Sequence, residues 1–471
     1  MNPSFPPNPP AMSLFRPPIN RAMRILDRSF FTKEIPLSAA RIFDNRHITK
    51  CRTELSWDLL KLERISSVRV DPDPGLAGEG KRCLLLRPEV KVDDRETWSS
   101  TLKELVRVEE VGVIPYTLRL DYDYWTYHDI MTSILPEEDQ DEIPVGFTLV
   151  GHIAHLNLRA PYLPYKHLLA TILLDKNPPV RTVINKTSDV GTTSTFRTFT
   201  YELLAGSPDL NVVMREADCV FHFDYSKVYW NSRLNTEHNR LVNKFRPGEA
   251  VCDVMAGVGP FAVPAGRKGV FVWANDLNPD SFGSLRDAVV RNKVTQFVHP
   301  SNEDAKTFIP NSATYLLSTA TNPESSTVTL PAKPKRSSHS TSTPALPPTT
   351  IPLPLTFSHY VLNLPASSLS FLPHFVGLYA SHKHLFSDPS STRKLPMIHI
   401  HTFWTKSDDD RVAAEGICGE IGRLLDCAIS PDDEETEVWD VRDVAPLKRM
   451  FCVSFRLSEE VAFREVDGGT E

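Results

Sequence analysis

Residues 250–262, AVCDVMAGVGPFA, form the stretch that decides the fold of this chain. It begins with a short apolar run that ends in an acid, Asp253, as a buried strand of a parallel sheet does. Gly257 and Gly259 then allow a tight turn and the close approach of a ligand to the backbone. Ala262 is small enough for a helix to pack closely on the strand. This order predicts a strand, a glycine turn and a helix.

A second apolar run and a second acid follow at the spacing of a nucleoside site. Residues 270–275, VFVWAN, predict the next strand, and Asp276 lies at its end, about 20 residues beyond the glycine turn. A carboxylate there accepts both hydrogen bonds of a ribose diol. Asp253 disfavours the pyrophosphate of a dinucleotide but favours S-adenosylmethionine, which carries a positive sulfonium and ammonium. The alternative is an ordinary strand-turn-helix unit with a capping aspartate.

Length and composition limit the number of domains and the class of protein. A chain of 471 residues with 41% hydrophobic and 24% charged residues is expected to form two or three globular domains. We expect no membrane association, because no apolar run approaches the roughly 20 residues of a bilayer span. The net charge of −7 does not suggest nucleic acid, although a local basic face would be hidden in that sum. The seven cysteines are scattered without a C-x-x-C pair, so we expect reduced thiols in an intracellular protein.

The chain divides by composition into a tail and three domains. We expect a disordered or targeting tail (1–20), an N-terminal α+β domain (21–141), a second α+β domain (142–223) and a larger α/β domain (224–465). The charged run between Leu135 and Pro144 marks the first domain boundary. Residues 311–354 are rich in Ser, Thr and Pro and predict a disordered insertion in the last domain.

Two loops at predicted strand ends extend the expected ligand site. Ligands of doubly wound sheets lie outside the carboxyl ends of the strands. Asp304 and Ala305 follow a short strand at residues 297–300, where the loop borders the expected adenine pocket. Asn363 follows a strand at residues 360–362, and Pro365 fixes the backbone so that the Asn363 amide presents a donor and an acceptor to the edge of the substrate or to the methyl donor, which makes it a candidate catalytic residue.

The last part of the chain predicts the remaining strands of the sheet. Residues 397–404 alternate as a strand, residues 411–425 predict a helix, and two strands at 437–444 and 450–457 predict a mixed sheet with an antiparallel edge. His399 and His401 share one face of their strand. No third ligand is evident from the sequence, so we expect no metal.

A dense group of cations and aromatic residues precedes the glycine turn. Tyr229-Trp230-Asn231-Ser232-Arg233 leads into a predicted helix near Thr236, which carries Glu237, His238 and Arg240. This mixture suits an anionic substrate with flat rings, and an exposed basic helix is the alternative.

Together these motifs resemble the eukaryotic and archaeal tRNA (guanine-37-N1)-methyltransferases, the Trm5 family. The resemblance rests on several separated motifs in the same order: residues 223–240, 253–261, 274–279 and 363–365, supported by residues 176–186, 196–206 and 441–446. It covers about Gly146 to Leu457, and the first block matches only loosely. Two departures concern the adenine side: Glu303-Asp304-Ala305 stands where the family more often has Asp-Gly, and the Ser/Thr/Pro segment separates this loop from Asn363.

The resemblance implies a class I, Rossmann-like methyltransferase domain with upstream RNA-binding domains, of which the first contacts the tRNA body. It implies methyl transfer from S-adenosylmethionine to N1 of guanosine 37. The implied cofactor contacts are His238, Asp276, Leu277, Asp304, Ala305 and Asn363, beside the Asp253, Gly257 and Gly259 of the glycine turn. Arg233 is implied to stabilise the guanine O6, and Glu237, close to it in sequence, is our candidate for the base that removes the N1 proton.

Two other functions stay open at this stage. An enzyme of the same fold could transfer the aminocarboxypropyl group of S-adenosylmethionine in the wybutosine pathway, and a decayed domain could bind RNA without catalysis. We expect a monomer that binds tRNA carrying guanosine 37 and acts in the cytoplasm, with the mitochondrial matrix and the nucleus as alternatives. The arginines and prolines of the first 45 residues suit a mitochondrial presequence and a plain disordered tail equally.

Overall fold

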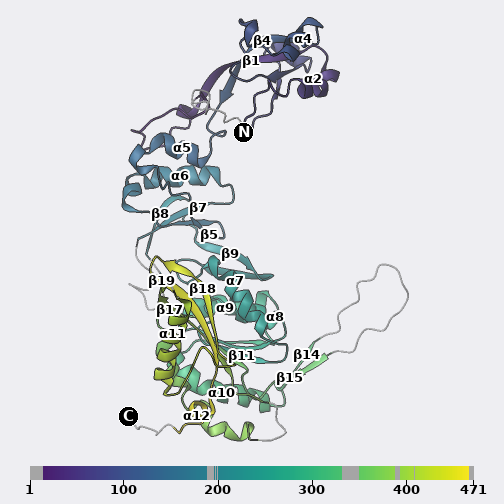
Figure 1. Ribbon diagram of the computed structural model, residues 1–471. Coiled ribbons are helices and arrows are strands. Elements are labelled where there is room, and N and C mark those ends of the chain that lie inside the picture. The colour runs from purple at the N-terminus through teal and green to yellow at the C-terminus, as the bar shows by residue number, and fades with distance from the viewer. Residues whose placement is uncertain are drawn as a thin grey trace, which may run out of the picture. The chain divides into compact units, whose positions relative to one another are not determined.

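The computed structural model describes residues 14–187, 196, 198, 200–330, 349–387, 393–407 and 409–465 (Figure 1). The chain forms two compact units. Unit 1 contains the described residues up to Phe147, with residues 156–185 and 203–206, and unit 2 contains the rest. Among the described residues, no helix has both the length and the apolar content needed to cross a bilayer.

Unit 1 begins with a four-stranded antiparallel sheet in the order β2-β3-β1-β4. Its elements are β1 (Lys33–Ile42), α2 (Ile48–Glu54), β2 (Val68–Val70), α3 (Pro74–Gly78), β3 (Arg82–Leu85), α4 (Ser100–Arg107) and β4 (Val111–Leu120). Ser99 caps α4 by accepting a hydrogen bond from the Leu102 amide, and Leu102 and Leu105 are buried in the same apolar cluster as Leu84.

Unit 1 continues through α5 (Tyr127–Ile134), α6 (Lys166–Lys176), β7 (Thr182–Lys186) and β8 (Tyr201–Gly206). Helices α5 and α6 pack on each other within this compact unit, so the chain does not divide at the predicted boundary 141/142. The charged run is not a linker, because its backbone carbonyls at Asp139 and Glu142 accept hydrogen bonds from the Tyr162 hydroxyl. The predicted tail is also shorter, since the Asn20 amide donates to Ser133 O at 2.9 Å; residues 1–13 lie outside the described residues.

Unit 2 is built on a seven-stranded sheet in the order β13-β12-β11-β16-β17-β19-β18. These strands are β11 (Ala250–Asp253), β12 (Phe271–Asn275), β13 (Val298–Ser301), β16 (His359–Leu362), β17 (Met397–Thr405), β18 (Glu437–Ala445) and β19 (Lys448–Arg456). The first five in this order run parallel, whereas β19 is antiparallel to β17 and to β18. The sheet is therefore mixed, as predicted, but the antiparallel strand lies next to the edge because the final strand inserts between β17 and β18.

Helices connect and cover the parallel strands, as Figure 1 shows for α8, α9, α10 and α11 around the sheet. The remaining elements of unit 2 are β5 (Thr148–Val150), β6 (Ile153–Leu156), β9 (Asn211–Glu216), β10 (Cys219–Asp224), α7 (Asn235–Lys244), α8 (Ala262–Arg267), α9 (Pro279–Arg291), α10 (Ala305–Thr321), β14 (Thr327–Leu330), β15 (Thr349–Pro352), α11 (Asp410–Leu425) and α12 (Glu459–Ala462), with short 3-10 turns between them. Every residue of β11 and β12 is buried, which explains their continuous apolar sequence.

The predicted disordered insertion is wrong over much of its length. Helix α10 runs through residues 311–321, because Phe308, Ile309, Ala313 and Leu316 recur at helical spacing and are buried. Strands β14 and β15 then pair in antiparallel register on either side of residues 331–348, which lie outside the described residues.

Candidate active site

A pocket opens at the carboxyl ends of β11, β12, β13 and β16, where a doubly wound sheet places its ligand. The predicted residues Gly257, Asp276, Leu277, Asp304, Ala305 and Asn363 line it. Sequence reasoning had not assigned the other lining residues to the cofactor: Phe196, Tyr229, Val254, Met255, Asn275, Asn278, Ser281, Leu364 and Phe371. The ends of four strands therefore meet at one site together with Phe196, Tyr229 and Phe371.

The glycine turn presents backbone to this pocket. Gly257 has φ +57°, and a Cβ added there would meet nothing within 4 Å, so it would project into open space. Its amide donates to Asp276 Oδ2 at 2.8 Å, while Asp276 Oδ1 accepts from the Asn278 amide at 2.9 Å. These two bonds fix the orientation of the Asp276 carboxylate, which burial gives a raised pKa. A ribose diol donating to this carboxylate would favour its ionised form.

Gly259 serves packing rather than ligand contact. It has φ +96°, and a Cβ there would lie 2.6 Å from Leu285 Cδ1 of α9. The residue does not line the pocket. Of the two glycines predicted to contact the cofactor, Gly257 lines the pocket and Gly259 does not, because α9 occupies the space beside Gly259.

Two buried polar groups at strand ends have no hydrogen-bond partner: both carboxyl oxygens of Asp253 and Oδ1 of Asn363. Asp253 is fully buried at the end of β11, directly before the lining residues Val254 and Met255. Burial and the neighbouring Asp276 raise the pKa of Asp253 to about 8. An unsatisfied buried acid costs stability, and a cation nearby relieves that cost. The site thus fits a ligand that carries positive charge, as S-adenosylmethionine does.

The residues predicted to contact the adenine side, Asp304 and Ala305, lie in the pocket wall beside Leu277. Leu277 is 47% exposed at the pocket edge, and Asp304 caps α10 by accepting a hydrogen bond from the Lys306 amide at 2.9 Å. Asn275 holds this side together: its Oδ1 accepts from the Glu303 amide, and its Nδ2 donates to Val254 O and Glu303 O. Its place directly before Asp276 was the available sequence signal for this role.

Comparison with known proteins identifies the family. The TYW2 N-terminal domain family matches residues 127–209, and the TRM5/TYW2 methyltransferase domain family matches residues 212–316. A tRNA (guanine(37)-N(1))-methyltransferase of Aspergillus fumigatus is 53% identical to this chain, covering 96% of each. The Fusarium vanettenii enzyme of the same name is 50% identical, covering 96% of this chain and 97% of its own length. This chain belongs to the tRNA (guanine(37)-N(1))-methyltransferase family.

Solved structures share the fold of this family at low sequence identity. The complex of aTrm5 with tRNALeu has a TM-score of 0.57 at 18% identity, covering 90% of this chain and 100% of that one. Trm5b from Pyrococcus abyssi has a TM-score of 0.54 at 18% identity, covering 89% and 99%. The first matched family begins at Tyr127, the first residue of α5, which agrees with the packing of α5 on α6.

Arg233, Glu237 and His238, the predicted site residues of the cation-rich segment, do not line the pocket. Arg233 is exposed in a 3-10 turn (Ser232–Leu234) that Asn231 caps. His238 is buried on α7, where its Nδ1 lies 2.5 Å from Glu216 Oε1 and its ring meets Phe261 edge-on. His238 thus ties α7 to β9, and its contact with the cofactor stays a prediction.

Glu237 lies buried in an ion-pair network. Both of its oxygens accept from the Arg240 guanidinium, at 2.7 and 2.9 Å, and Oε1 lies 2.8 Å from His401 Nε2. Burial opposes ionisation of Glu237, but the bonds from Arg240 and His401 outweigh it and lower its pKa to about 2. Glu237 is therefore ionised at neutral pH and is held away from the pocket.

The structure supplies the neighbours of His401 that the sequence did not reveal. Donor atoms of Glu237, His401 and Cys452 lie within 4.8 Å of one another. Burial opposes protonation of His401, but Cys452 and Glu237 outweigh it and raise the pKa of His401 to about 10. Its two ring nitrogens face acceptors, Glu237 Oε1 and Leu362 O, as a protonated ring requires. With Arg240 already on the carboxylate, the group is a buried ion pair rather than a cation site.

Proposed function

We propose that this chain transfers a methyl group from S-adenosylmethionine to N1 of guanosine 37 of tRNA. The observation that carries the proposal is the pocket, where Asp276 is orientated to bind a ribose and the buried acid Asp253 is unpaired. Relatives that bear the name of this activity match 96% of the chain. S-adenosylmethionine supplies a methyl group activated by its sulfonium. Asp276 would hold the ribose, Gly257 would let the cofactor approach the backbone, and Asp253 would offset its positive charge.

The reaction sets two demands on the chain at the guanine. The N1 proton must leave as the methyl group arrives, and charge that builds on O6 must be stabilised. Asn363 lies in the pocket with an unpaired Oδ1, so it is suited to accept a hydrogen bond from the guanine edge. Arg233, exposed and without a carboxylate partner among the described residues, is suited to stabilise O6.

Glu237 stays our candidate for the base. To reach N1 it must leave Arg240 and His401, and loss of the Arg240 contact would raise its pKa toward the ordinary value and make it a stronger base. The proposal thus requires a rearrangement of α7 or of the Glu237 side chain when tRNA binds.

Aminocarboxypropyl transfer is the second candidate, because the matched family descriptions include TYW2. The pocket does not by itself separate the two reactions, since both use the same cofactor. The relatives that match nearly the whole chain carry the methyltransferase name, which favours methyl transfer.

Labelled cofactor tests the proposal in two steps. Equilibrium dialysis of the full chain with S-adenosylmethionine should show binding, and incubation with S-adenosylmethionine labelled in the methyl group should move the label into tRNA. Absence of binding at high micromolar cofactor would favour a non-catalytic RNA-binding protein. If the cofactor binds but label enters tRNA only when it is carried by the aminocarboxypropyl carbons of S-adenosylmethionine, the second candidate would be favoured.

We also propose that the chain acts as a monomer in the cytoplasm, with the mitochondrial matrix and the nucleus as alternative sites. Both statements rest on the sequence. Light scattering of the purified chain tests the first, and fractionation of cells expressing it tests the second.

A further inference from the structure

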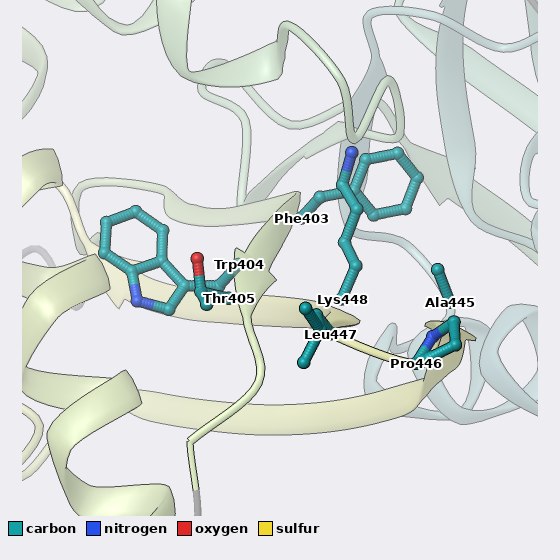
Figure 2. Close-up of a pocket in the computed structure, with 7 residues that line it drawn as sticks. All are labelled: Phe403, Trp404, Thr405, Ala445, Pro446, Leu447 and Lys448. Carbon is teal, nitrogen blue, oxygen red and sulfur yellow. The ribbon is translucent and has the colours of Figure 1, made fainter.

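A second pocket lies between the end of β17 and the turn that joins β18 to β19, lined by residues 403–405 and 445–448 (Figure 2). The Phe403 amide donates to Pro365 O at 3.1 Å, which fixes the end of β17 to the Asn363-Leu364-Pro365 loop. Asn363 and Leu364 line the cofactor pocket. The second pocket is therefore built against the loop that carries the proposed guanine contact, at the same end of the sheet.

One wall of this pocket is an aromatic ring with a cation over it. Lys448 Nζ lies 4.6 Å from the centroid of the Phe403 ring, and Figure 2 shows the two side chains running alongside each other. Trp404 projects to the other side of β17, where its ring packs closely on Gly416 of α11. Both rings line the pocket, and Phe403 is the one that has the cation beside it.

Lys448 is the cation that lines this pocket. No carboxylate pairs with it among the residues that the structure describes, whereas its neighbours are paired: Arg449 contacts Asp410, Asp440 and Asp443, and Lys406 contacts Asp443. Arg442, on β18, likewise has no carboxylate partner within the described ranges. Burial and the nearby Arg233 lower the pKa of Arg442, so an anion here would relieve repulsion between two arginines.

The turn also exposes apolar surface. Leu447, which lines the pocket with the half-buried Phe403, is 76% exposed, and Val444 on β18 is 39% exposed. An aromatic face, exposed aliphatic groups and an unpaired cation together match an unstacked nucleobase with its phosphate, since bases stack on aromatic rings and lysines contact phosphates. A protein partner would need larger continuous apolar surface and would not require the free cations.

We propose that this pocket binds one unstacked base of the tRNA anticodon loop other than guanosine 37, with the base stacked on Phe403 and the adjoining phosphate on Lys448. The inference rests on the proposed function, because it takes tRNA as the substrate. Continuity with the Asn363 loop makes the subsite part of the grip that holds the target guanosine at the cofactor pocket.

The test uses the full chain, full-length tRNA and three variants. Phe403→Leu removes the ring and keeps an apolar side chain, Lys448→Gln removes the free cation, and Lys406→Gln is the control because its lysine is already paired with Asp443. Phe403→Leu should weaken tRNA binding by about tenfold. Lys448→Gln should lower the slope of log affinity against log salt by about one. The control should change neither, and S-adenosylmethionine binding should stay at the wild-type value in all three.

Substrates that lack single bases identify the partner nucleotide. Each tRNA in a series is abasic at one anticodon-loop position, and its binding to the wild type and to Phe403→Leu is compared. At the position whose base stacks on Phe403, the abasic tRNA should bind both proteins equally weakly. At every other position, the losses of binding free energy from the missing base and from Phe403→Leu should add. Wild-type affinity and salt dependence in both Phe403→Leu and Lys448→Gln would overturn the subsite. If the wild type itself leaves tRNA unmethylated, the proposed function fails instead, so the two failures are distinguishable.

Discussion

The unpaired carboxyl of Asp253 gives the site a pH dependence whose sign can be worked out. Asp253 holds its proton up to about pH 8 when folded and about pH 4 when unfolded, so the folded state binds more protons between these values. The stability of the cofactor-free protein should therefore fall as pH rises through this window, by up to about 1.4 kcal/mol per pH unit. Urea unfolding at several pH values should show this fall in the wild type and not in Asp253→Asn.

Cofactor affinity should respond in the opposite direction. A cationic ligand favours the ionised acid, so S-adenosylmethionine should bind up to about tenfold more tightly per pH unit between pH 6 and 8. Calorimetry in buffers of different ionisation enthalpy would detect the proton released on binding. A flat affinity profile in the wild type would show that Asp253 does not face the cofactor charge.

Arg233 is expected to act on the rate rather than on binding. Arg233→Ala should lower the rate of methyl transfer by about two decades or more, with little change in tRNA affinity, because the interaction with O6 strengthens only as charge builds there. Single-turnover rates and a filter-binding titration separate the two quantities. A loss confined to affinity would make Arg233 a phosphate contact.

Glu237 carries a stability prediction and a catalytic one. Glu237→Gln leaves Arg240 and His401 without their buried partner, so it should cost about 3–5 kcal/mol of unfolding free energy near neutral pH. The wild-type contribution should be lost as pH falls from about 4.5 toward 2, because the folded pKa is lowered. Glu415→Gln, an exposed acid on α11, is the control. An unchanged pH-rate profile in Glu237→Gln would remove Glu237 as the base.

Site residues that belong to one local sequence motif could be predicted, whereas contacts between residues far apart in the sequence could not. Gly257 and Asp276 follow from the spacing of one strand-turn-strand unit. The contact between Glu237 and His401 joins residues 164 positions apart, so no local pattern announces it. The same holds for Tyr229 in the pocket wall, which reaches the site because Asn278 donates to Lys227 O and draws its loop against α9.

The two glycines of the turn between β11 and α8 can be compared directly, because Gly257 faces the pocket and Gly259 packs on α9. Gly257→Ala should weaken S-adenosylmethionine binding with a modest loss of stability of about 1 kcal/mol, because its Cβ projects into open space at φ +57°. Gly259→Ala should cost more stability, about 2–4 kcal/mol, because its Cβ would overlap Leu285 of α9. Thermal unfolding and equilibrium dialysis on both variants check this; equal effects on both readouts would contradict the separation.

The elements also show where composition misleads. The run rich in Ser, Thr and Pro suggested disorder, yet the apolar residues of α10 recur at helical spacing, and Ser312 pairs with the buried Tyr360 hydroxyl at 2.8 Å. The order of β18 and β19 in the sheet could not be predicted either, because the sequence of a hairpin does not determine which of its two strands pairs with β17.

At the scale of the whole molecule, unit 1 has no part of the cofactor pocket among its described residues. Selection of one tRNA position requires contacts away from the target base. We therefore expect a chain lacking residues 1–120, which keeps α5 with α6, to bind S-adenosylmethionine normally and to discriminate less between full-length tRNA and an isolated anticodon stem-loop. Competition binding with both RNAs measures this. Unchanged discrimination would exclude contact of the N-terminal domain with the tRNA body.

Nucleoside analysis of tRNA after reaction with the full chain tests the central claim most directly. Two otherwise identical transcripts, with guanosine or adenosine at position 37, are incubated with S-adenosylmethionine, digested to nucleosides and analysed by mass spectrometry against authentic standards. We expect 1-methylguanosine from the guanosine transcript and no modification of the adenosine transcript. An aminocarboxypropyl adduct, a methyl group at another guanine atom or position, or no modification of either transcript would contradict it.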